Sequence, residues 1–243
     1  MSELTQWLLA AAAVALGASI QGATGFGFAV LSIPLLSLIY DPHTAVILGL
    51  CLSVVSSSMM VVRLRAQVDW RALARWVAYG AAGLPVGVWI FGALDPGRLK
   101  LLIAVVVGLL AIVLLRGVTL RTRYLGRAEF VAALTAGTLA TSVGMPGPPM
   151  VLFVSVAAYE KARFRATLSS FGFVTSLLSV GALALAGSVS LRVLGLAGTL
   201  SVGIVGGLML GAFVQRGFDQ RQFNRAVLVI LLVLAGVTAF GAR

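Results

Sequence analysis

The chain has 243 residues, of which 60% are hydrophobic and 10% charged, and this composition excludes an ordinary soluble domain. A formal net charge of +11 would favour a nucleic-acid partner in a soluble protein, but here the basic residues lie in short stretches between long apolar runs. Basic loops that face anionic membrane lipid account for the charge, so no nucleic acid is expected to bind. We therefore expect an all-α, multi-pass membrane protein in which residues 1–243 form a single membrane domain.

The apolar segments predict two sets of membrane helices in the same order. In the first half they cover residues 6–21, 26–40, 43–62, 72–92 and 99–115. In the second half they cover residues 128–143, 148–158, 166–187, 193–214 and 223–240. Each half thus contains a broken or re-entrant helix pair plus three membrane helices. The order indicates an internal duplication, with repeat one at 1–116, a basic linker at 117–127 and repeat two at 128–243.

The distribution of positive charge favours one orientation of these repeats. If each broken pair returns to the side that it entered, the two repeats have inverted topology. All basic residues except Arg98, Lys100, Arg192 and Arg243 then face the cytoplasm, whereas parallel repeats would divide them almost evenly. The positive-inside rule therefore favours inverted repeats with both termini outside. The first pair of broken segments is too short for a ~30 Å hydrocarbon core, which leaves six and ten crossings as alternatives.

Each half is interrupted by a motif rich in glycine or proline. The two motifs are Gly22-Ala23-Thr24-Gly25-Phe26-Gly27-Phe28 and Thr141-Ser142-Val143-Gly144-Met145-Pro146-Gly147-Pro148-Pro149. Interrupted segments at corresponding places in two halves are typical of the binding site of a secondary transporter. The free amides at the start of a helix suit an anion. The alternative is that glycine and proline only allow kinks and close helix packing.

In the inverted arrangement the two breaks approach each other near the membrane midplane. Thr24 is expected to cap a helix that begins near Phe26, and Pro148 and Pro149 suit a first helical turn. Glycines let a ligand approach the backbone closely, and nearby polar side chains offer further donors. The substrate-binding candidates are Gln21, Gly22, Thr24, Gly25, Phe26, Gly27, Phe28, Thr141, Ser142, Gly144, Met145 and Gly147.

Polar, glycine and basic positions elsewhere allow two interpretations each. Serine and threonine stripes either line the pathway or bond between helices; they are Ser53, Ser56, Ser57 and Ser58, then Thr167, Ser169, Ser170, Thr175 and Ser176. Glycine stripes are interpreted as sites of close helix packing, and a homodimer formed through them remains an alternative; they are Gly80, Gly83 and Gly87, then Gly203, Gly207 and Gly211.

Two basic residues, Arg163 and Arg165, lie at the cytoplasmic start of a predicted helix. We interpret them first as charges that set the orientation in the membrane, and second as a site that attracts anions from the cytoplasm.

The acidic residues limit the chemistry. All seven lie in loops or at helix ends, so neither a proton relay nor a cation site within the membrane is expected. An inside-negative potential drives a monovalent anion outward by ~2.3 kcal/mol per 100 mV, which favours export of a small anion. The sequence has no buried acid pair, Ser–His dyad or HExxH motif, so we expect neither an enzyme nor a metal or cofactor. An anion channel and a non-transporting assembly or scaffold protein are the alternatives.

The motifs resemble those of the TauE/SafE sulfite exporter family, also called the toluenesulfonate uptake permease family. The resemblance rests on the break from Gly22 to Phe28 running to Pro34, on Ser142 to Pro149, and on the glycine-rich third helix of each half. It implies a carrier in the bacterial inner membrane for sulfite, organosulfonates or other small sulfur-containing anions. Phe26, Phe28, Met145, Pro146 and Pro148 depart from the commoner family pattern, and the two phenylalanines would suit an organic tail.

Overall fold

The computed structural model describes residues 2–116, 124–157, 160–217 and 232–238, and within these ranges the chain is helical without a strand. The elements are α1 (Glu3–Thr24), α2 (Phe28–Leu36), α3 (Pro42–Leu64), the 3-10 turn η1 (Arg65–Gln67), α4 (Trp70–Ala93), α5 (Pro96–Arg116), α6 (Leu125–Val143), α7 (Gly147–Ala157), α8 (Lys161–Leu185) and α9 (Leu191–Gly217). The expected all-α class is confirmed. The last expected segment lies largely outside the described residues, and its described part, 232–238, is helical.

Helix starts follow short capping signals in the sequence. The Asp41 carboxylate accepts hydrogen bonds from the amides of His43 (3.0 Å) and Thr44 (3.4 Å), and Pro42 occupies the first position of α3. The Asp69 carboxylate accepts from the Ala72 amide at 3.0 Å at the start of α4. Such caps satisfy amides that have no partner within the helix.

Six of the described helices are long and apolar enough to cross a membrane. They cover Glu3–Thr24, Pro42–Gln67, Trp70–Ala93, Pro96–Val113, Ala162–Leu185 and Leu191–Gly211. The chain is therefore a multi-pass membrane protein. One expectation was wrong: α1, with 22 residues, is about 33 Å long and is not too short to span, because the helix continues through Gly22 and Thr24. Its partner α2 has only nine residues, so the first broken pair joins a full-length helix to a half-length one.

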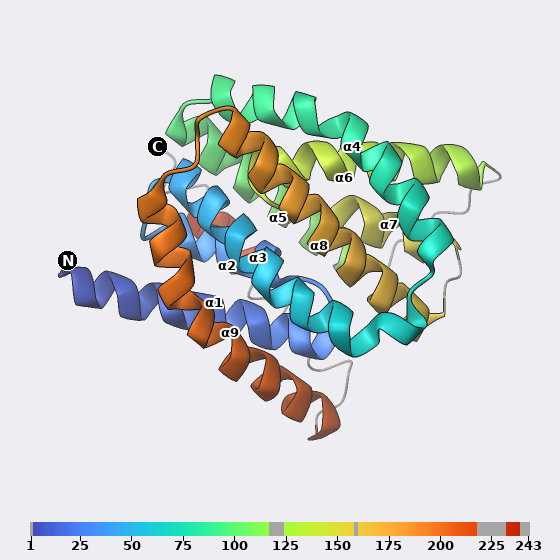
Figure 1. The fold of residues 1–243 in the computed structure, drawn as a ribbon, viewed down its shortest axis with the longest axis horizontal. Coiled ribbons are helices and arrows are strands. Elements are labelled where there is room, and N and C mark those ends of the chain that lie inside the picture. The colour runs from blue at the N-terminus through green and yellow to red at the C-terminus, as the bar shows by residue number, and fades with distance from the viewer. Residues whose placement is uncertain (1, 117–123, 158–159, 218–231, 239–243) are drawn as a thin grey trace.

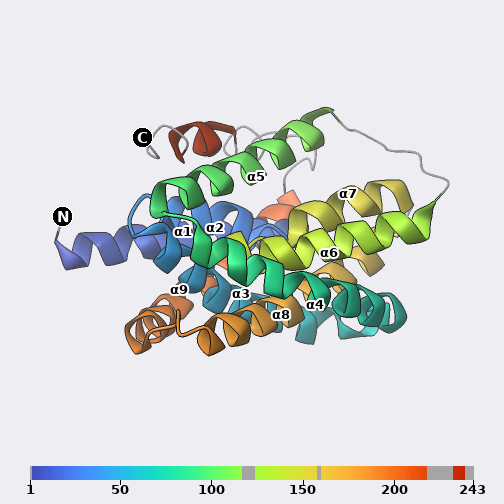
Figure 2. The same ribbon diagram turned by 90° about the horizontal axis from the view of Figure 1, so that it is seen from above.

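The two halves of the chain are interleaved (Figure 1). α1 packs along α9, α4 packs along α6, and α3 and α8 lie against each other between these two pairs. α3 and α8 run in opposite directions in this view. α5 lies to one side, next to residues 232–238 (Figure 2), where the Cα of Gly108 faces Ala235. As a result, the long helix of each broken pair packs mainly on a helix of the other half, whereas the short helices α2 and α7 pack on helices of their own half.

Glycines set the close approach of the two long helix pairs. A methyl group added at Gly83 or Gly87 of α4 would collide with the carbonyl oxygens of Leu134 or Thr138 on α6. A methyl group at Gly207 of α9 would collide with the carbonyl oxygen of Ala15 on α1. Backbones that approach so closely are typical of helix pairs in membranes. These stripes therefore serve packing within one chain.

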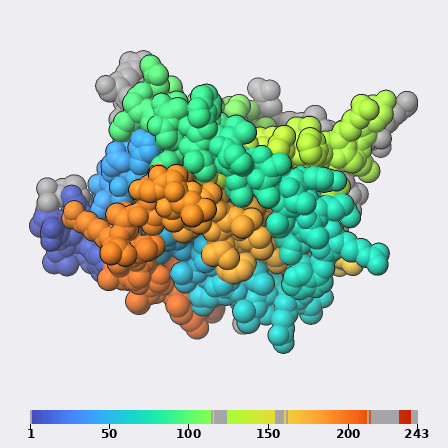
Figure 3. Space-filling model, turned by 45° about the horizontal axis from the view of Figure 1, so that its top comes forward, coloured from blue at the N-terminus to red at the C-terminus, as the bar shows by residue number. Residues whose placement is uncertain are grey.

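The outer surface carries large apolar side chains, as expected for contact with lipid. Trp89, Leu185, Val202, Met209 and Phe213 are all exposed. The space-filling view shows α8 at the surface between α4 and α3 (Figure 3). The opposite side of α8 is buried and polar, with Ser169, Ser170, Thr175, Ser176 and Ser179. α8 therefore presents an apolar side outward and hydroxyl groups inward.

Candidate functional site

Both helix breaks are built on a glycine with a left-handed backbone. Gly25, with φ of 87°, caps the C-terminus of α1, and Gly144, with φ of 75°, caps the C-terminus of α6. Residues other than glycine rarely adopt this conformation, which is typical of a helix C-cap. The Gly25 amide donates to the Gln21 carbonyl oxygen at 2.7 Å, and the Met145 amide donates to the Leu139 carbonyl oxygen at 3.1 Å. Both breaks thus close on a left-handed glycine, but the first closes with a bond from the glycine itself to the residue four before it, and the second with a wider turn onto Leu139.

The breaks are narrower than the sequence motifs suggested. Gly22 and Thr24 lie inside α1, and α2 begins at Phe28 after Gly27, with no side-chain cap. The expectation that Thr24 caps the second helix was therefore wrong. The Thr24 hydroxyl contacts the carbonyl oxygens of Ile20 (2.8 Å) and Phe26 (2.5 Å), so it closes the turn instead. In the second break, Pro148 and Pro149 do occupy the first turn of α7.

Thr141 and Ser142 likewise lie inside α6 rather than in the break. The Thr141 hydroxyl donates to the Gly137 carbonyl oxygen at 3.3 Å and contacts the Ser179 hydroxyl at 3.1 Å. The Ser142 hydroxyl donates to the Thr138 carbonyl oxygen at 2.8 Å. Hydroxyl groups within a helix commonly bond to the carbonyl one turn earlier. These two side chains are therefore committed to the helix and to α8.

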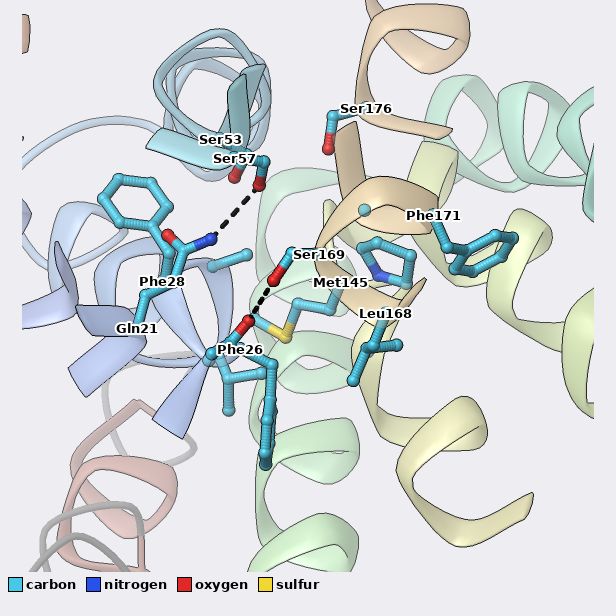
Figure 4. Close-up of a pocket in the computed structure, with 17 residues that line it drawn as sticks. Gln21, Phe26, Phe28, Ser53, Ser57, Met145, Leu168, Ser169, Phe171 and Ser176 are labelled. Atoms are coloured by element: carbon cyan, nitrogen blue, oxygen red, sulfur yellow. Dashed lines mark hydrogen bonds between the residues drawn. The ribbon is translucent and has the colours of Figure 1, made fainter. Parts of the chain in front are cut away.

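A pocket lies where the two breaks meet α3 and α8 (Figure 4). Its cavity volume is about 50 Å³, and because one water needs roughly 10–15 Å³ on this measure, it has room for a few waters or one small ion. Seven of the twelve candidates line it: Gln21, Gly25, Phe26, Gly27, Phe28, Met145 and Gly147. Five do not: Gly22, Thr24, Thr141, Ser142 and Gly144.

The polar lining of the pocket comes from the two central helices and α1. The Gln21 amide Nε2 donates to the Ser57 hydroxyl at 3.2 Å, and the Ser56 hydroxyl donates to Gln21 Oε1. The Ser169 hydroxyl of α8 donates to the Gly25 carbonyl oxygen at 2.6 Å. These bonds hold the tip of α1 against both α3 and α8 (Figure 4).

A fully buried hydroxyl in the pocket has no partner among the described residues. Ser53 is 6% exposed, its Oγ makes no hydrogen bond within the described part of the chain, and it lines the pocket beside Ser57. A buried polar atom without a partner is unusual in a folded protein. Ser53, Ser57, Ser169 and Ser176 belong to the polar stripes of the sequence, but only the structure separates them from neighbours such as Ser170, whose hydroxyl bonds to its own helix.

Arg165 lies at the edge of this site, although its position near a helix start suggested mainly a topological charge. Its side chain fills the space that a Cβ of Gly25 would need: an added Cβ would lie 2.7 Å from Nε and 3.0 Å from Cγ. Its Nη2 donates to the Gly22 carbonyl oxygen at 3.5 Å. Sequence reasoning placed this arginine at the correct helix end but could not tell that its side chain folds inward over the break.

Among the residues that the structure describes, no acidic side chain lines the pocket. Within the described ranges, no three His, Cys, Asp or Glu side chains come together as metal ligands would. The pocket combines apolar walls with a few donor groups: Ser53 has an unbonded hydroxyl among the described residues, whereas Ser169 and Gln21 already donate to Gly25 and Ser57. Such a site can hold a small hydrogen-bond acceptor that carries negative charge.

Comparison with known proteins adds one finding. The sequence model of a family described as sulfite exporter TauE/SafE matches residues 9–238, nearly the whole chain. No curated protein and no solved structure gives a significant match.

Proposed function

This chain belongs to the TauE/SafE sulfite exporter family, and from this we propose that it exports a small sulfur oxyanion through the pocket between its two helix breaks. Members of the family are membrane transporters, not enzymes. Sulfite is the first substrate that we propose, and the proposed location is the inner membrane of a bacterium. The observation that carries the proposal is the meeting of both breaks with the serines of α3 and α8 at one cavity.

The chemistry of the pocket supports an anion over a cation. Carbonyl oxygens of the first break, which could otherwise bind a cation, already accept hydrogen bonds: Gly22 from Arg165, Gly25 from Ser169 and Phe26 from Thr24. The groups nearest the cavity that still have capacity are hydroxyl donors such as Ser53. Donors fixed in a dry site interact strongly with negative charge, because little water screens them.

The size of the pocket supports a small ion. About 50 Å³ suits an ion of four heavy atoms such as sulfite, since that space corresponds to a few waters. A bulky organosulfonate would need the pocket to enlarge. The side chain of Phe28 is 2% exposed and packs in the core. It therefore bounds the pocket on one side and leaves no open surface for an organic tail.

Several features support inverted repeats as the basis of transport. The equivalent breaks end on Gly25 and Gly144, and the equivalent glycine-rich helices, α4 and α9, each pack against the first helix of the other half. The equivalent central helices, α3 and α8, run in opposite directions (Figure 1). We propose that rocking of one half against the other opens the pocket to either side in turn, as in other transporters with inverted repeats.

Efflux of sulfite from proteoliposomes under an imposed potential tests this function. The proposal predicts saturable efflux that an inside-negative potential accelerates and that supports counterflow of labelled sulfite. Flux that rises linearly with concentration without counterflow would indicate an anion channel instead. Absence of flux for sulfite and for small organosulfonates would contradict the proposal and leave a scaffold or assembly role.

A further inference from the structure

The arginine that covers the first helix break has no acidic partner among the described residues. Within that part of the chain, Nε of Arg165 is buried and makes no hydrogen bond, and the side chain's single hydrogen bond, from Nη2 to the Gly22 carbonyl oxygen, is long at 3.5 Å. In the part of the chain that the structure describes, the ion pairs are His43 with Asp41, Arg75 with Glu129 and Arg98 with Asp95, so no carboxylate pairs with Arg165.

Among the described residues, the charge that acts on Arg165 is another cation. The positive charge of Arg63, at the end of α3, opposes that of the Arg165 guanidinium. A half-buried guanidinium beside a second positive charge is a costly arrangement, because burial removes water that would otherwise screen both charges. A bound anion near the two guanidinium groups would lower their repulsion and could supply the acceptor that Nε lacks. The two like charges therefore favour a negative ligand at this end of α8.

The position of Arg165 joins this site to the pocket. Ser169 follows Arg165 by one helical turn on α8, and its hydroxyl bonds to the Gly25 carbonyl oxygen. Gly25 lines the pocket on one side and contacts Arg165 on the other. At the same α3–α8 interface, Ser53 carries another buried polar atom without a partner; the third in the described part of the chain, the Thr238 hydroxyl, belongs to a different segment. The unsatisfied donors of Arg165 and Ser53 thus mark a route from the start of α8 into the cavity.

We propose that Arg165 forms a capture site for a small oxyanion at the cytoplasmic mouth of the pocket, from which the ion passes to the serines around Ser53. This inference rests on the proposed function and names a specificity-determining residue for it. The planar guanidinium presents paired N–H donors that match two oxygens of one anion. Arg63 adds positive potential at the mouth, which raises the local concentration of anions.

A purely structural role for Arg165 predicts different behaviour. In a structural role, Arg165 would hold α8 against the C-terminal end of α1 through its bond to Gly22. Its replacement would then lower the unfolding temperature by the same amount with or without anion. As a capture site, it would change the response of the protein to anion concentration. Ligand binding raises the unfolding temperature according to concentration relative to Kd, so the two roles separate in one measurement.

The experiment measures the unfolding temperature of the purified full-length protein across a series of sulfite concentrations, for wild type, Arg165→Gln and Arg163→Gln. Arg163 lies on the same helix, is exposed and carries the same charge, so its replacement controls for net charge. We expect Arg165→Gln to raise the sulfite concentration for half-maximal stabilisation by about tenfold or more, and Arg163→Gln to leave it within about twofold. Equal curves for the two variants would overturn the inference.

A second variant keeps the proposal testable if Arg165→Gln does not fold. Arg165→Lys keeps the charge but loses the paired donors, and we expect a shift smaller than that of Arg165→Gln, together with a raised KM for sulfite efflux from the cytoplasmic face. An Arg165→Lys protein with wild-type half-maximal concentration and KM would overturn the inference. If the wild-type protein still exports sulfite, such a result overturns only the role of Arg165. If the wild-type protein neither binds nor transports sulfite, the proposed function is overturned as well.

Discussion

The Ser169 hydroxyl donates a 2.6 Å hydrogen bond to the carbonyl oxygen of Gly25, so a helix of the second half is joined directly to the helix break of the first. Carbonyl groups at a helix C-terminus have no partner within the helix. Ser169 supplies one from α8, while Gln21 joins the same segment to Ser56 and Ser57 on α3. The break is thus held between the two central helices, which would have to move together with it during transport.

Loss of this bond should be measurable as stability. We expect Ser169→Ala to lower the free energy of unfolding by about 1 kcal/mol, because it leaves the buried Gly25 carbonyl oxygen without its donor. Ser170→Ala is the matched control: Ser170 is as buried, but its hydroxyl bonds to the Ala166 carbonyl oxygen of its own helix. Thermal or denaturant unfolding in detergent compares the two. If both changes lowered the free energy of unfolding equally, the bond to Gly25 would contribute no more than a bond within the helix, and the prediction would be wrong.

The left-handed glycine of the second break should resist substitution. We expect Gly144→Ala to lower stability by at least about 1–2 kcal/mol, because φ of 75° disfavours a Cβ and the added methyl would collide with Ile33. Gly181→Ala on α8 has open space around its Cβ and should be neutral or stabilising by up to about 1 kcal/mol. Unfolding temperatures of the two variants check the prediction, and an unchanged Gly144→Ala protein would contradict the geometry of the break.

The packing of α9 on α1 gives a third prediction. We expect Gly207→Ala to cost about 1–3 kcal/mol, since its methyl would overlap the Ala15 carbonyl oxygen and force the helices apart. Gly195→Ala, on the same helix with no atom near its Cβ, serves as the control. Urea unfolding or proteolysis in detergent would rank the two proteins. A Gly207→Ala protein as stable as the control would mean that these helices do not approach so closely.

The cap of α4 predicts a dependence on pH. The hydrogen bond from the Ala72 amide lowers the pKa of Asp69 from its ordinary value, with help from nearby Arg163. A lowered folded-state pKa means that the stabilisation is present above the unfolded pKa of about 4 and is lost as the pH falls through the folded value. At neutral pH we expect Asp69→Ala to cost about 1 kcal/mol, and the difference from wild type to shrink below about pH 4.

Asp69→Asn separates the charge from the cap. Asparagine caps a helix about as well as aspartate but does not titrate, so its stability should lie near that of wild type at neutral pH and keep its advantage over Asp69→Ala in acid. Unfolding temperatures measured from neutral to acidic pH give both comparisons. A constant difference between wild type and Asp69→Ala at every pH would contradict the cap.

Much of the architecture could be predicted from the sequence because its signals are local. Apolar runs predicted the helices, and Gly25 and Gly144 marked the breaks, since few other residues permit that turn. Thr24 was wrongly predicted to cap α2, and Thr141 and Ser142 do not line the pocket, because a hydroxyl next to a break is still able to bond to its own helix. The inward fold of Arg165 and the selection of Ser53 and Ser169 from a longer polar stripe depend on contacts between distant segments, which no local pattern contains.

The most direct test of the central claim is sulfite efflux from proteoliposomes that contain Gly172→Leu, compared with Gly181→Leu. Both glycines lie on α8, but Gly172 lines the pocket, and a Cβ there would lie 3.8 Å from the Ser57 hydroxyl without a clash. A leucine at Gly172 should therefore fill the cavity in a folded protein, whereas one at Gly181 enters open space. We predict that Gly172→Leu loses saturable efflux while Gly181→Leu retains it. Wild-type efflux through Gly172→Leu would contradict the claim that the anion passes between the two breaks.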